Sequence, residues 1–212
     1  MKLPLAQRLR KRLHASIGLL QDELVELVYG LDNEAVLHGG TAIWRCYGGN
    51  RFSEDIDLYS KKITKGALEE ALPSRGLDVR KLKRTENLIF CKVAGPAAEM
   101  RLELNLVANV SSVLKNYERM DGSEMPVLTL SPEDLILEKI EAYKARRYVR
   151  DVYDMYHLLP LASDEGRVKK ALAGFIRTIE APVDEAVLKT VVYAGRAPTF
   201  KEMLLALRRG AR

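Results

Sequence analysis

The stretch HGGTAIWRCYGGNRFSEDIDL, residues 38–58, carries most of the information about the fold. A short apolar run, AVLH at 35–38, leads into it and predicts a strand that stops at the first glycine pair. Thr41 follows these glycines and can cap a short helix with apolar side chains. A second glycine pair then breaks the helix, and DIDLYS at 55–60 predicts another strand. The stretch therefore predicts a strand, a helix and a second strand in close succession.

Two aspartates, Asp55 and Asp57, alternate with apolar residues in the second of these strands. Residues two apart on a strand point to the same side, with Cα atoms roughly 6.5–7 Å apart, so both carboxylates share one face while Ile56 and Leu58 enter the core. Such a pair can bind divalent cations, and Mg²⁺ prefers oxygen ligands together with substrate phosphates. Taken alone, this short motif is more often the solvated face of an edge strand.

The turn upstream of the aspartates favours a phosphate-binding function. Gly39 and Gly40 allow backbone N–H groups to approach a triphosphate closely, and the helix that starts near Thr41 adds positive potential. Arg51 and Ser53 precede the aspartates and can reach the same phosphates. Each feature also has a simpler interpretation, because a glycine pair is often only a tight turn and the other two residues can be a loop arginine and a strand cap. Together, the turn and the acidic pair supply both parts of a phosphoryl-transfer site.

Further strands are expected downstream of the acidic pair. LDVRKLKR at 77–84 and LIFCKV at 88–93 can each form a strand, and MRLELNLVAN at 100–109 alternates between apolar and polar residues. Residues 1–30 carry leucines at the four-residue spacing of a helix face. The sequence thus predicts an N-terminal domain over residues 1–125, made of helices and a mixed sheet.

Helical signals dominate after Pro126, where we expect strand signals to end. In SPEDLILEKIEAYKARRY, Ser131 is a suitable N-cap, Pro132 takes the first helical position, and two acidic residues in the first turn suit the helix dipole. DVYDMYHLL at 151–159 and the segments that follow it are typical of further helices. We therefore expect a helical C-terminal domain over residues 126–212 and an α+β chain overall.

Composition narrows the class of protein without identifying it. The chain has 212 residues, 47% of them hydrophobic, which is enough for a globular core. Its apolar runs are too short to span a membrane and its basic N-terminal segment lacks the features of a signal peptide, so we expect a soluble, cytoplasmic protein with no membrane partner. Cys46 and Cys91 have no spacing typical of a disulfide framework or a zinc site. The net charge of +5 suits a polyanionic partner such as a nucleotide or RNA.

The glycine turn and the aspartate pair resemble a known signature. Their order is similar to that of the DNA polymerase β-type nucleotidyltransferase superfamily, and GGTAI…RFSEDIDL resembles the AbiEii/AbiGii toxin family of type IV toxin–antitoxin systems. A separate segment, LTLSPEDLILEKIEAYKARRYVRDVYDMYHLL at 128–159, is similar to that family's C-terminal pattern. The resemblance covers roughly residues 35–160 and implies the polymerase β-type mixed sheet, followed by a helical domain.

The resemblance also assigns roles to residues outside the first stretch. It implies that Lys139 neutralises the phosphates of the donor nucleotide, and that Asp151 or Asp154 orients this charge or helps to position the acceptor. It implies a third carboxylate on a neighbouring strand, for which Glu103 in RLELN fits best. Without the resemblance, such lysines and aspartates are usually surface charges paired with neighbours at helical spacing.

The activity implied by the resemblance is Mg²⁺-dependent nucleotidyl transfer. Two Mg²⁺ ions on Asp55, Asp57 and Glu103 would serve transfer from an NTP donor to an acceptor hydroxyl, with release of pyrophosphate. The implied acceptor is an RNA end, such as that of a tRNA, and a cognate antitoxin protein is a further partner. Transfer to a protein hydroxyl or to a small molecule stays open as an alternative. So does an inactive fold that acts as a binding partner, although the retention of both aspartates argues against it.

Overall fold

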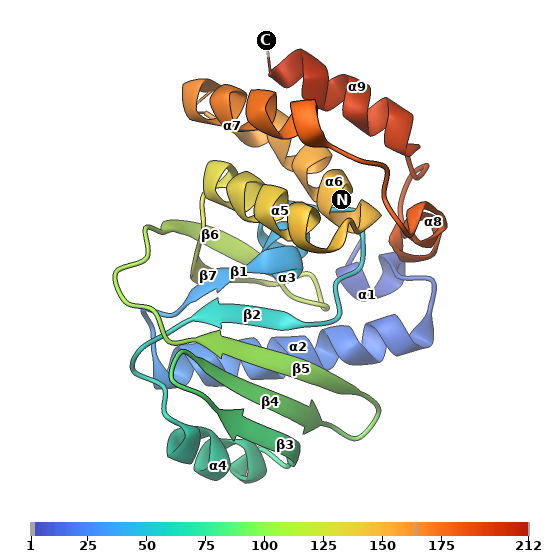
Figure 1. Cartoon of the computed structure of the whole chain (residues 1–212). Helices are drawn as coiled ribbons and strands as arrows, with labels where there is room; N and C mark the ends of the chain where they lie inside the picture. Colours follow the sequence, from blue (N-terminus) through green and yellow to red (C-terminus); the bar gives the residue numbers. More distant parts are fainter. Residues whose placement is uncertain (1–2, 164, 212) are drawn as a thin grey trace.

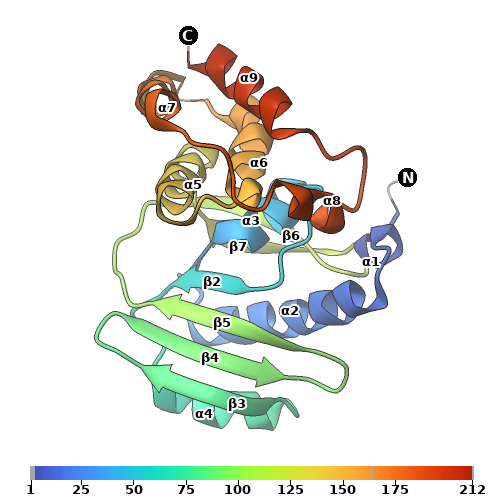
Figure 2. The same cartoon turned by 45° about the vertical axis from the view of Figure 1, so that its right-hand side comes forward.

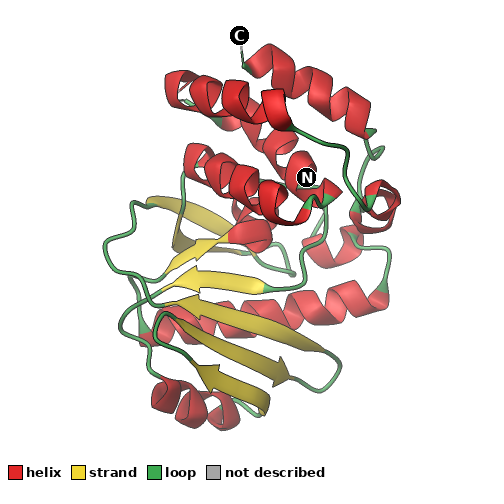
Figure 3. Ribbon diagram, in the orientation of Figure 1, coloured by secondary structure: helices red, strands yellow, loops and turns green. Residues whose placement is uncertain are grey.

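The computed structural model describes residues 3–163 and 165–211 and has one mixed sheet at its centre (Figure 1). In this described part of the chain, seven strands follow the order β3-β4-β5-β2-β1-β7-β6. They are β1 (Val36–His38), β2 (Ile56–Tyr59), β3 (Asp78–Arg84), β4 (Leu88–Ala94), β5 (Glu99–Asn105), β6 (Val113–Glu118) and β7 (Glu124–Thr129). Helices flank the sheet, which confirms the predicted fold class (Figure 3).

Two groups of helices surround the sheet. The long helix α2 runs behind β5 and β4, α4 lies beside β3, and α5 to α9 gather at the opposite end of the molecule (Figures 1 and 2). The helices are α1 (Leu5–Arg8), α2 (Arg12–Leu31), α3 (Gly39–Cys46), α4 (Lys65–Ser74), α5 (Pro132–Arg146), α6 (Val149–Leu158), α7 (Glu165–Thr178), α8 (Leu188–Val191) and α9 (Phe200–Gly210). Among the described residues, no helix combines the length and the apolar character needed to cross a membrane.

The centre of the sheet brings distant parts of the sequence into register. Strand β2 pairs antiparallel with β1, where His38 lies opposite Asp57, and parallel with β5, where Glu103 is the partner of Asp57. The alternation in β2 places Ile56 and Leu58 in the core, where both are fully buried. Asp57 therefore projects from the other face of the sheet, between a histidine and a second acidic residue.

Helix α5 begins where the sequence predicts. The Ser131 hydroxyl accepts a hydrogen bond of 3.1 Å from the backbone N–H of Asp134, and Pro132 occupies the first helical position. The helix ends at Arg146, and the C-cap residue Arg147 adopts a left-handed conformation with φ of 56°. Within the helix, Lys139 lies on the buried face together with Leu135, Ile136, Ile140 and Tyr143.

The prediction that strands end at Pro126 is wrong. Pro126 lies inside β7, which pairs antiparallel with β6 over its whole length. On its other side β7 pairs with β1 only at Leu128 and Thr129, so no strand lies beside Pro126 on that flank. A proline is tolerated where one side of a strand has no ladder partner, and for this reason its presence did not exclude a strand.

The C-terminal part of the chain returns to the region around the acidic pair. Arg51 forms an isolated β-bridge with Val192, and the backbone N–H of Tyr193 donates to the carbonyl of Asn50 over 3.0 Å. The Trp44 indole donates to the Tyr193 hydroxyl, also over 3.0 Å. The expected boundary between residues 125 and 126 falls within β7, and the division into two domains stays a prediction.

Candidate functional site

A polar cavity of about 470 Å³ lies between the sheet and helices α5 and α6. It takes residues from the loop before β2, from β2, β5 and α5, and from the start of α6 with Tyr148 just before it. Its lining consists of Gly40, Arg51, Ser53, Asp55, Asp57, Arg101, Glu103, Lys139, Arg146, Tyr148 and Arg150. Residues predicted from two separate motifs thus meet in one space.

Two of the carboxylates in this cavity face it without a partner. Asp57 and Glu103 are cross-strand neighbours, and neither forms a hydrogen bond or an ion pair with any other described residue. Burial raises the pKa of Asp57, the negative charge of Asp55 raises it further, and His38 and Lys139 oppose this effect. Burial and the charge of Asp57 likewise raise the pKa of Glu103. A cation between them would relieve this repulsion.

Asp55, by contrast, already has a partner. Its two oxygens accept hydrogen bonds from Arg101, from Nε over 2.9 Å and from Nη2 over 2.6 Å. This forked geometry is the strongest form of an arginine–carboxylate pair. Arg101 lies two residues before Glu103 on the same face of β5, so the alternation in RLELN was the signal that placed it near the site.

The residues fit a hard divalent cation, although not in the arrangement expected from the sequence. Asp57 and Glu103 supply adjacent, unpartnered oxygens of the kind that Mg²⁺ prefers. Among the described residues, no group of three or more His, Cys, Asp or Glu side chains is arranged to hold a metal ion. Asp57 and Glu103 would therefore hold it, and Asp55 would join them only in exchange for its pair with Arg101.

The turn requires glycines because a Cβ atom at either position would collide with side chains of the cavity. Gly39 has φ of +70°, and a Cβ atom there would lie 2.4 Å from Oδ2 of Asp57. A Cβ atom at Gly40 would lie 2.5 Å from Oγ of Ser53 and 2.6 Å from Nη2 of Arg51. The pair therefore leaves room for the side chains that line the cavity, a role that the sequence did not reveal.

Replacing Gly39 with alanine is expected to destabilise the protein more than the same change at Gly48. Both glycines have positive φ, but nothing lies within 4 Å of a Cβ atom at Gly48. Gly48→Ala should therefore lower the free energy of unfolding by about 1–2 kcal/mol, through backbone strain alone. Gly39→Ala should cost an additional 1–3 kcal/mol, roughly the cost of overpacking, because its Cβ meets Asp57.

Urea unfolding of both variants, in wild-type and Asp57→Ala backgrounds, measures this difference. In the Asp57→Ala background the cost of Gly39→Ala should fall most of the way to that of Gly48→Ala, because only the Cβ atom of residue 57 stays close. Equal costs in the wild-type background would show that the turn does not press on the carboxylate.

Thr41 lies outside the cavity, and the prediction that it caps the helix is wrong. Helix α3 already begins at Gly39, after His38, and Thr41 is fully buried inside it. Its hydroxyl donates to the backbone carbonyl of Asp55 and lies 3.4 Å from Nε2 of Gln21. Thr41 therefore fixes the entry of the chain into β2 and does not face the space where phosphates would lie.

Lys139 belongs to a buried network of charges. Its Nζ lies 3.0 Å from Oδ2 of Asp154 and 3.6 Å from Oδ1 of Asp151. Asp154 also accepts two hydrogen bonds from Arg51, over 2.5 and 2.6 Å. Burial by itself would raise the pKa of Asp154, but the charges of Arg51 and Lys139 lower it below its usual range. Asp154 thus holds two of the cavity's cationic side chains in place.

Asp151 lies outside the cavity as well. It is fully buried and accepts two hydrogen bonds from Arg146, over 2.9 and 2.7 Å. Arg146 in turn lines the cavity, next to Tyr148 and Arg150. Asp151 and Asp154 are therefore placed to position cationic residues and do not themselves face the open space.

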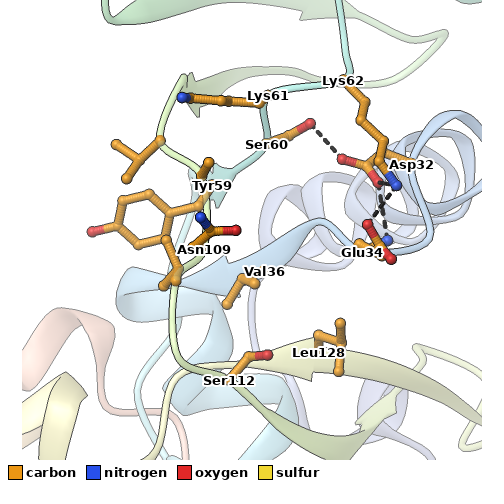
Figure 4. A pocket seen from close by; sticks show the side chains of 13 residues that line it. Asp32, Glu34, Val36, Tyr59, Ser60, Lys61, Lys62, Asn109, Ser112 and Leu128 are labelled. Atoms are coloured by element: carbon orange, nitrogen blue, oxygen red, sulfur yellow. Dashed lines mark hydrogen bonds and ion pairs between the residues drawn. The ribbon is translucent and has the colours of Figure 1, made fainter.

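A second cavity, of about 460 Å³ and lined by both polar and apolar residues, lies at the other end of β2 (Figure 4). Its acidic residues are already paired, since Ser60 donates to Asp32 over 2.7 Å and Lys62 forms ion pairs with Asp32 and Glu34. The glycine turn and the acidic pair at the start of β2 line the first cavity instead. The first cavity is therefore the better candidate for phosphoryl chemistry.

The fold and the first cavity combine the features expected of a nucleotidyltransferase. Acidic residues on adjacent strands lie beside a glycine turn and face a lysine from a packed helix. The model of a family described as the nucleotidyl transferase AbiEii toxin of a type IV toxin–antitoxin system matches residues 24–208. The chain belongs to this family, which confirms the resemblance seen in the sequence.

Solved structures show the same fold at low sequence identity. MenT4, a nucleotidyltransferase toxin from Mycobacterium tuberculosis, superposes with a TM-score of 0.62 and 20% identity, covering 93% of this chain and 82% of that one. JHP933 from Helicobacter pylori gives a TM-score of 0.59 and 21% identity, covering 92% and 90% of the two chains. No curated protein matches the chain.

Proposed function

We propose that this protein transfers a nucleoside monophosphate from an NTP to the terminal hydroxyl of an RNA, such as a tRNA, in a Mg²⁺-dependent reaction. The observation that carries the proposal is that Asp57, Glu103 and Lys139 meet in one cavity, although Asp57 and Lys139 are 82 positions apart in the sequence (139 − 57). Oxygen ligands for a cation and basic groups for phosphates are thereby combined in one space. Family membership supports nucleotidyl transfer and favours an antitoxin protein as a further partner.

Each group of residues in the cavity would have its own role in nucleotidyl transfer. The acceptor hydroxyl attacks the α-phosphorus, the bond from that phosphorus to the bridging oxygen breaks, and pyrophosphate leaves. Arg51 and Lys139 lie where they can bind the triphosphate and neutralise its charge. Glu103 can accept the hydroxyl proton or help to hold the cation. A divalent cation on Asp57 and Glu103 would polarise the phosphate oxygens.

The acceptor class is tested by a labelling experiment. The purified protein is incubated with Mg²⁺, each α-³²P-labelled NTP in turn, and either total RNA, a protein lysate or a small-molecule extract. Label on RNA, removed by ribonuclease and absent without Mg²⁺, is the expected outcome. Label only on protein or on small molecules would contradict the RNA acceptor but retain nucleotidyl transfer. No label on any acceptor would contradict the proposed activity itself.

Removing the charge of Lys139 is expected to lower kcat by roughly a hundredfold or more, which corresponds to about 2.7–4 kcal/mol in the barrier. The reason is that negative charge moves onto the leaving pyrophosphate in the transition state, where a fixed ammonium stabilises it. Lys139→Met is the better variant, because it keeps the aliphatic stem in a buried position. Lys139→Arg should restore only part of the rate, since a forked guanidinium does not replace a compact ammonium.

Lys144→Met is the matched control, because this lysine lies on the same helix but is exposed and pairs with Glu141. Turnover is measured at saturating Mg²⁺ and NTP, below the melting temperature of each variant. Wild-type turnover by Lys139→Met would show that Lys139 has only a structural role.

A further inference from the structure

One wing of the sheet has an uncovered face that leads into the cavity. Strands β3, β4 and β5 extend beyond the helices α5 to α9, while α2 and α4 lie against their back (Figures 1 and 2). Ile89, Cys91 and Val93 of β4 are fully buried on the covered side. Because side chains alternate along a strand, Phe90 and Lys92 project from the uncovered side.

Strand register arranges basic side chains on this face in two rows that end at the acidic pair. In the first row, Lys81 lies opposite Lys92 and Lys92 opposite Arg101, which holds Asp55. In the second row, Lys83 lies opposite Phe90, Phe90 opposite Glu103, and Glu103 beside Asp57. Neighbouring strands are about 4.8 Å apart, so each row covers about 14 Å from β3 to β2.

The charges in these rows are partly unpaired. Neither Lys81 nor Lys83 forms an ion pair with another described residue, although Lys81 Nζ lies 5.5 Å from the centre of the Phe90 ring. Lys92 pairs with Glu99 over 2.8 Å at the exposed surface. Lysines around an aromatic ring are the combination that binds a single-stranded nucleic acid, whose phosphates need cations and whose bases need a flat stacking surface.

We propose that this face, defined by Lys81, Lys83, Phe90 and Lys92, binds the single-stranded end of the RNA acceptor. Its phosphates would lie along the lysines and one base against Phe90, so that the terminal hydroxyl reaches the carboxylates of β2 and β5. This inference rests on the proposed function, which makes RNA the acceptor. An acidic protein segment would use the same charges but would gain little from a ring placed between them, and lysines on an edge strand can also serve only to prevent aggregation.

Binding of a 5′-fluorescein-labelled single-stranded RNA of twelve nucleotides, followed by anisotropy, tests the proposal. NTP is omitted and EDTA is present, so that binding is measured without turnover. The double variant Lys81→Ala/Lys83→Ala should bind roughly 10–30-fold more weakly at about 0.1 M salt. Each lost phosphate contact reduces the slope of log K against log salt concentration by about 0.7, so two lost contacts weaken binding by roughly this factor at about 0.1 M relative to about 1 M salt. Lys115→Ala/Lys201→Ala removes the same charge from the exposed far edge of the sheet and from α9, and should change binding less than about twofold.

Stacking is tested separately at Phe90. Phe90→Leu keeps an apolar side chain but removes the ring, and should weaken RNA binding by about fivefold or more. Inorganic polyphosphate, which has charge but no bases, should bind this variant as it binds the wild type. Phe90→Tyr keeps the ring face and should retain RNA binding.

The possible results separate this inference from the proposed function. Equal losses in the two double-lysine variants, or unchanged RNA binding by Lys81→Ala/Lys83→Ala, would overturn the inference even if RNA is labelled in the transfer assay. Lysine-dependent RNA binding without any nucleotidyl transfer would support the inference and contradict the proposed function. RNA binding that depends on the lysines but not on the Phe90 ring would overturn the stacking role and reduce the face to a general polyanion site.

Discussion

Replacing Asp57 with asparagine is expected to lower the rate of nucleotidyl transfer by about a thousandfold or more while leaving the fold intact. A metal ion stabilises transition-state charge by several kcal/mol, and each 1.36 kcal/mol is about tenfold in rate. Asp57 has no partner among the described residues, so no internal ion pair is lost in this variant. Asparagine has nearly the same shape and fits beside Gly39, which leaves the space that a Cβ atom would fill. The loss should therefore appear in turnover and not in folding.

Two measurements check this result. Turnover is compared with that of Glu34→Gln, a neutralised carboxylate from the second cavity, which should retain wild-type activity. Thermal unfolding is followed with Mg²⁺ alone, NTP alone and both together. Wild type should be stabilised mainly by the combination, by about 2.7 kcal/mol at a ligand concentration of 100 Kd, and Asp57→Asn should lose this effect. Full activity in Asp57→Asn, or equal loss in Glu34→Gln, would place the chemistry elsewhere.

Asp154→Asn is expected to produce the largest loss of stability, about 3–5 kcal/mol in the free energy of unfolding. The carboxylate is fully buried and is shared by Arg51, itself only 4% exposed, and Lys139. Neutralising it leaves two buried cations facing an amide. Asp151→Asn is the matched comparison: its carboxylate is equally buried, but the side chain of its main partner, Arg146, is 38% exposed and can turn to water. It should therefore lose less stability, and equal losses in the two variants would contradict this account.

Acid should remove the stabilising effect of Asp154. The pKa of this group is lowered in the folded state, so the folded protein holds its carboxylate charged at a pH where the unfolded chain already binds a proton. The stabilisation is complete above the ordinary carboxyl pKa of about 4 and disappears as the pH falls through that value towards the lowered one. The difference in unfolding free energy between wild type and Asp154→Asn, measured in urea from pH 7 to pH 3, should shrink with acid. A difference independent of pH would show that the lost stability is not electrostatic.

Local patterns in the sequence were sufficient to predict several features of this protein. Alternation identified β2 and β5 and the face on which Asp57 and Glu103 project, because burial on one side of a strand leaves a period of two. The N-cap at Ser131 and the following proline located the start of α5, because orphan N–H groups require a partner within the first turn. The two motifs together also indicated the family, and the family match confirmed it.

Tertiary structure alone decided which groups meet. It pairs Asp55 with Arg101, turns Thr41 into the interior, and buries Asp151 and Asp154 beneath the arginines and the lysine that they hold. It also adds β6 and β7 to the sheet and aligns the lysines of β3 and β4 with the acidic pair. Periodicity reports whether a residue is buried but not what lies opposite it. The partners of an ion pair or a strand come from positions far apart in the chain, and only the packed fold brings them within reach of one another.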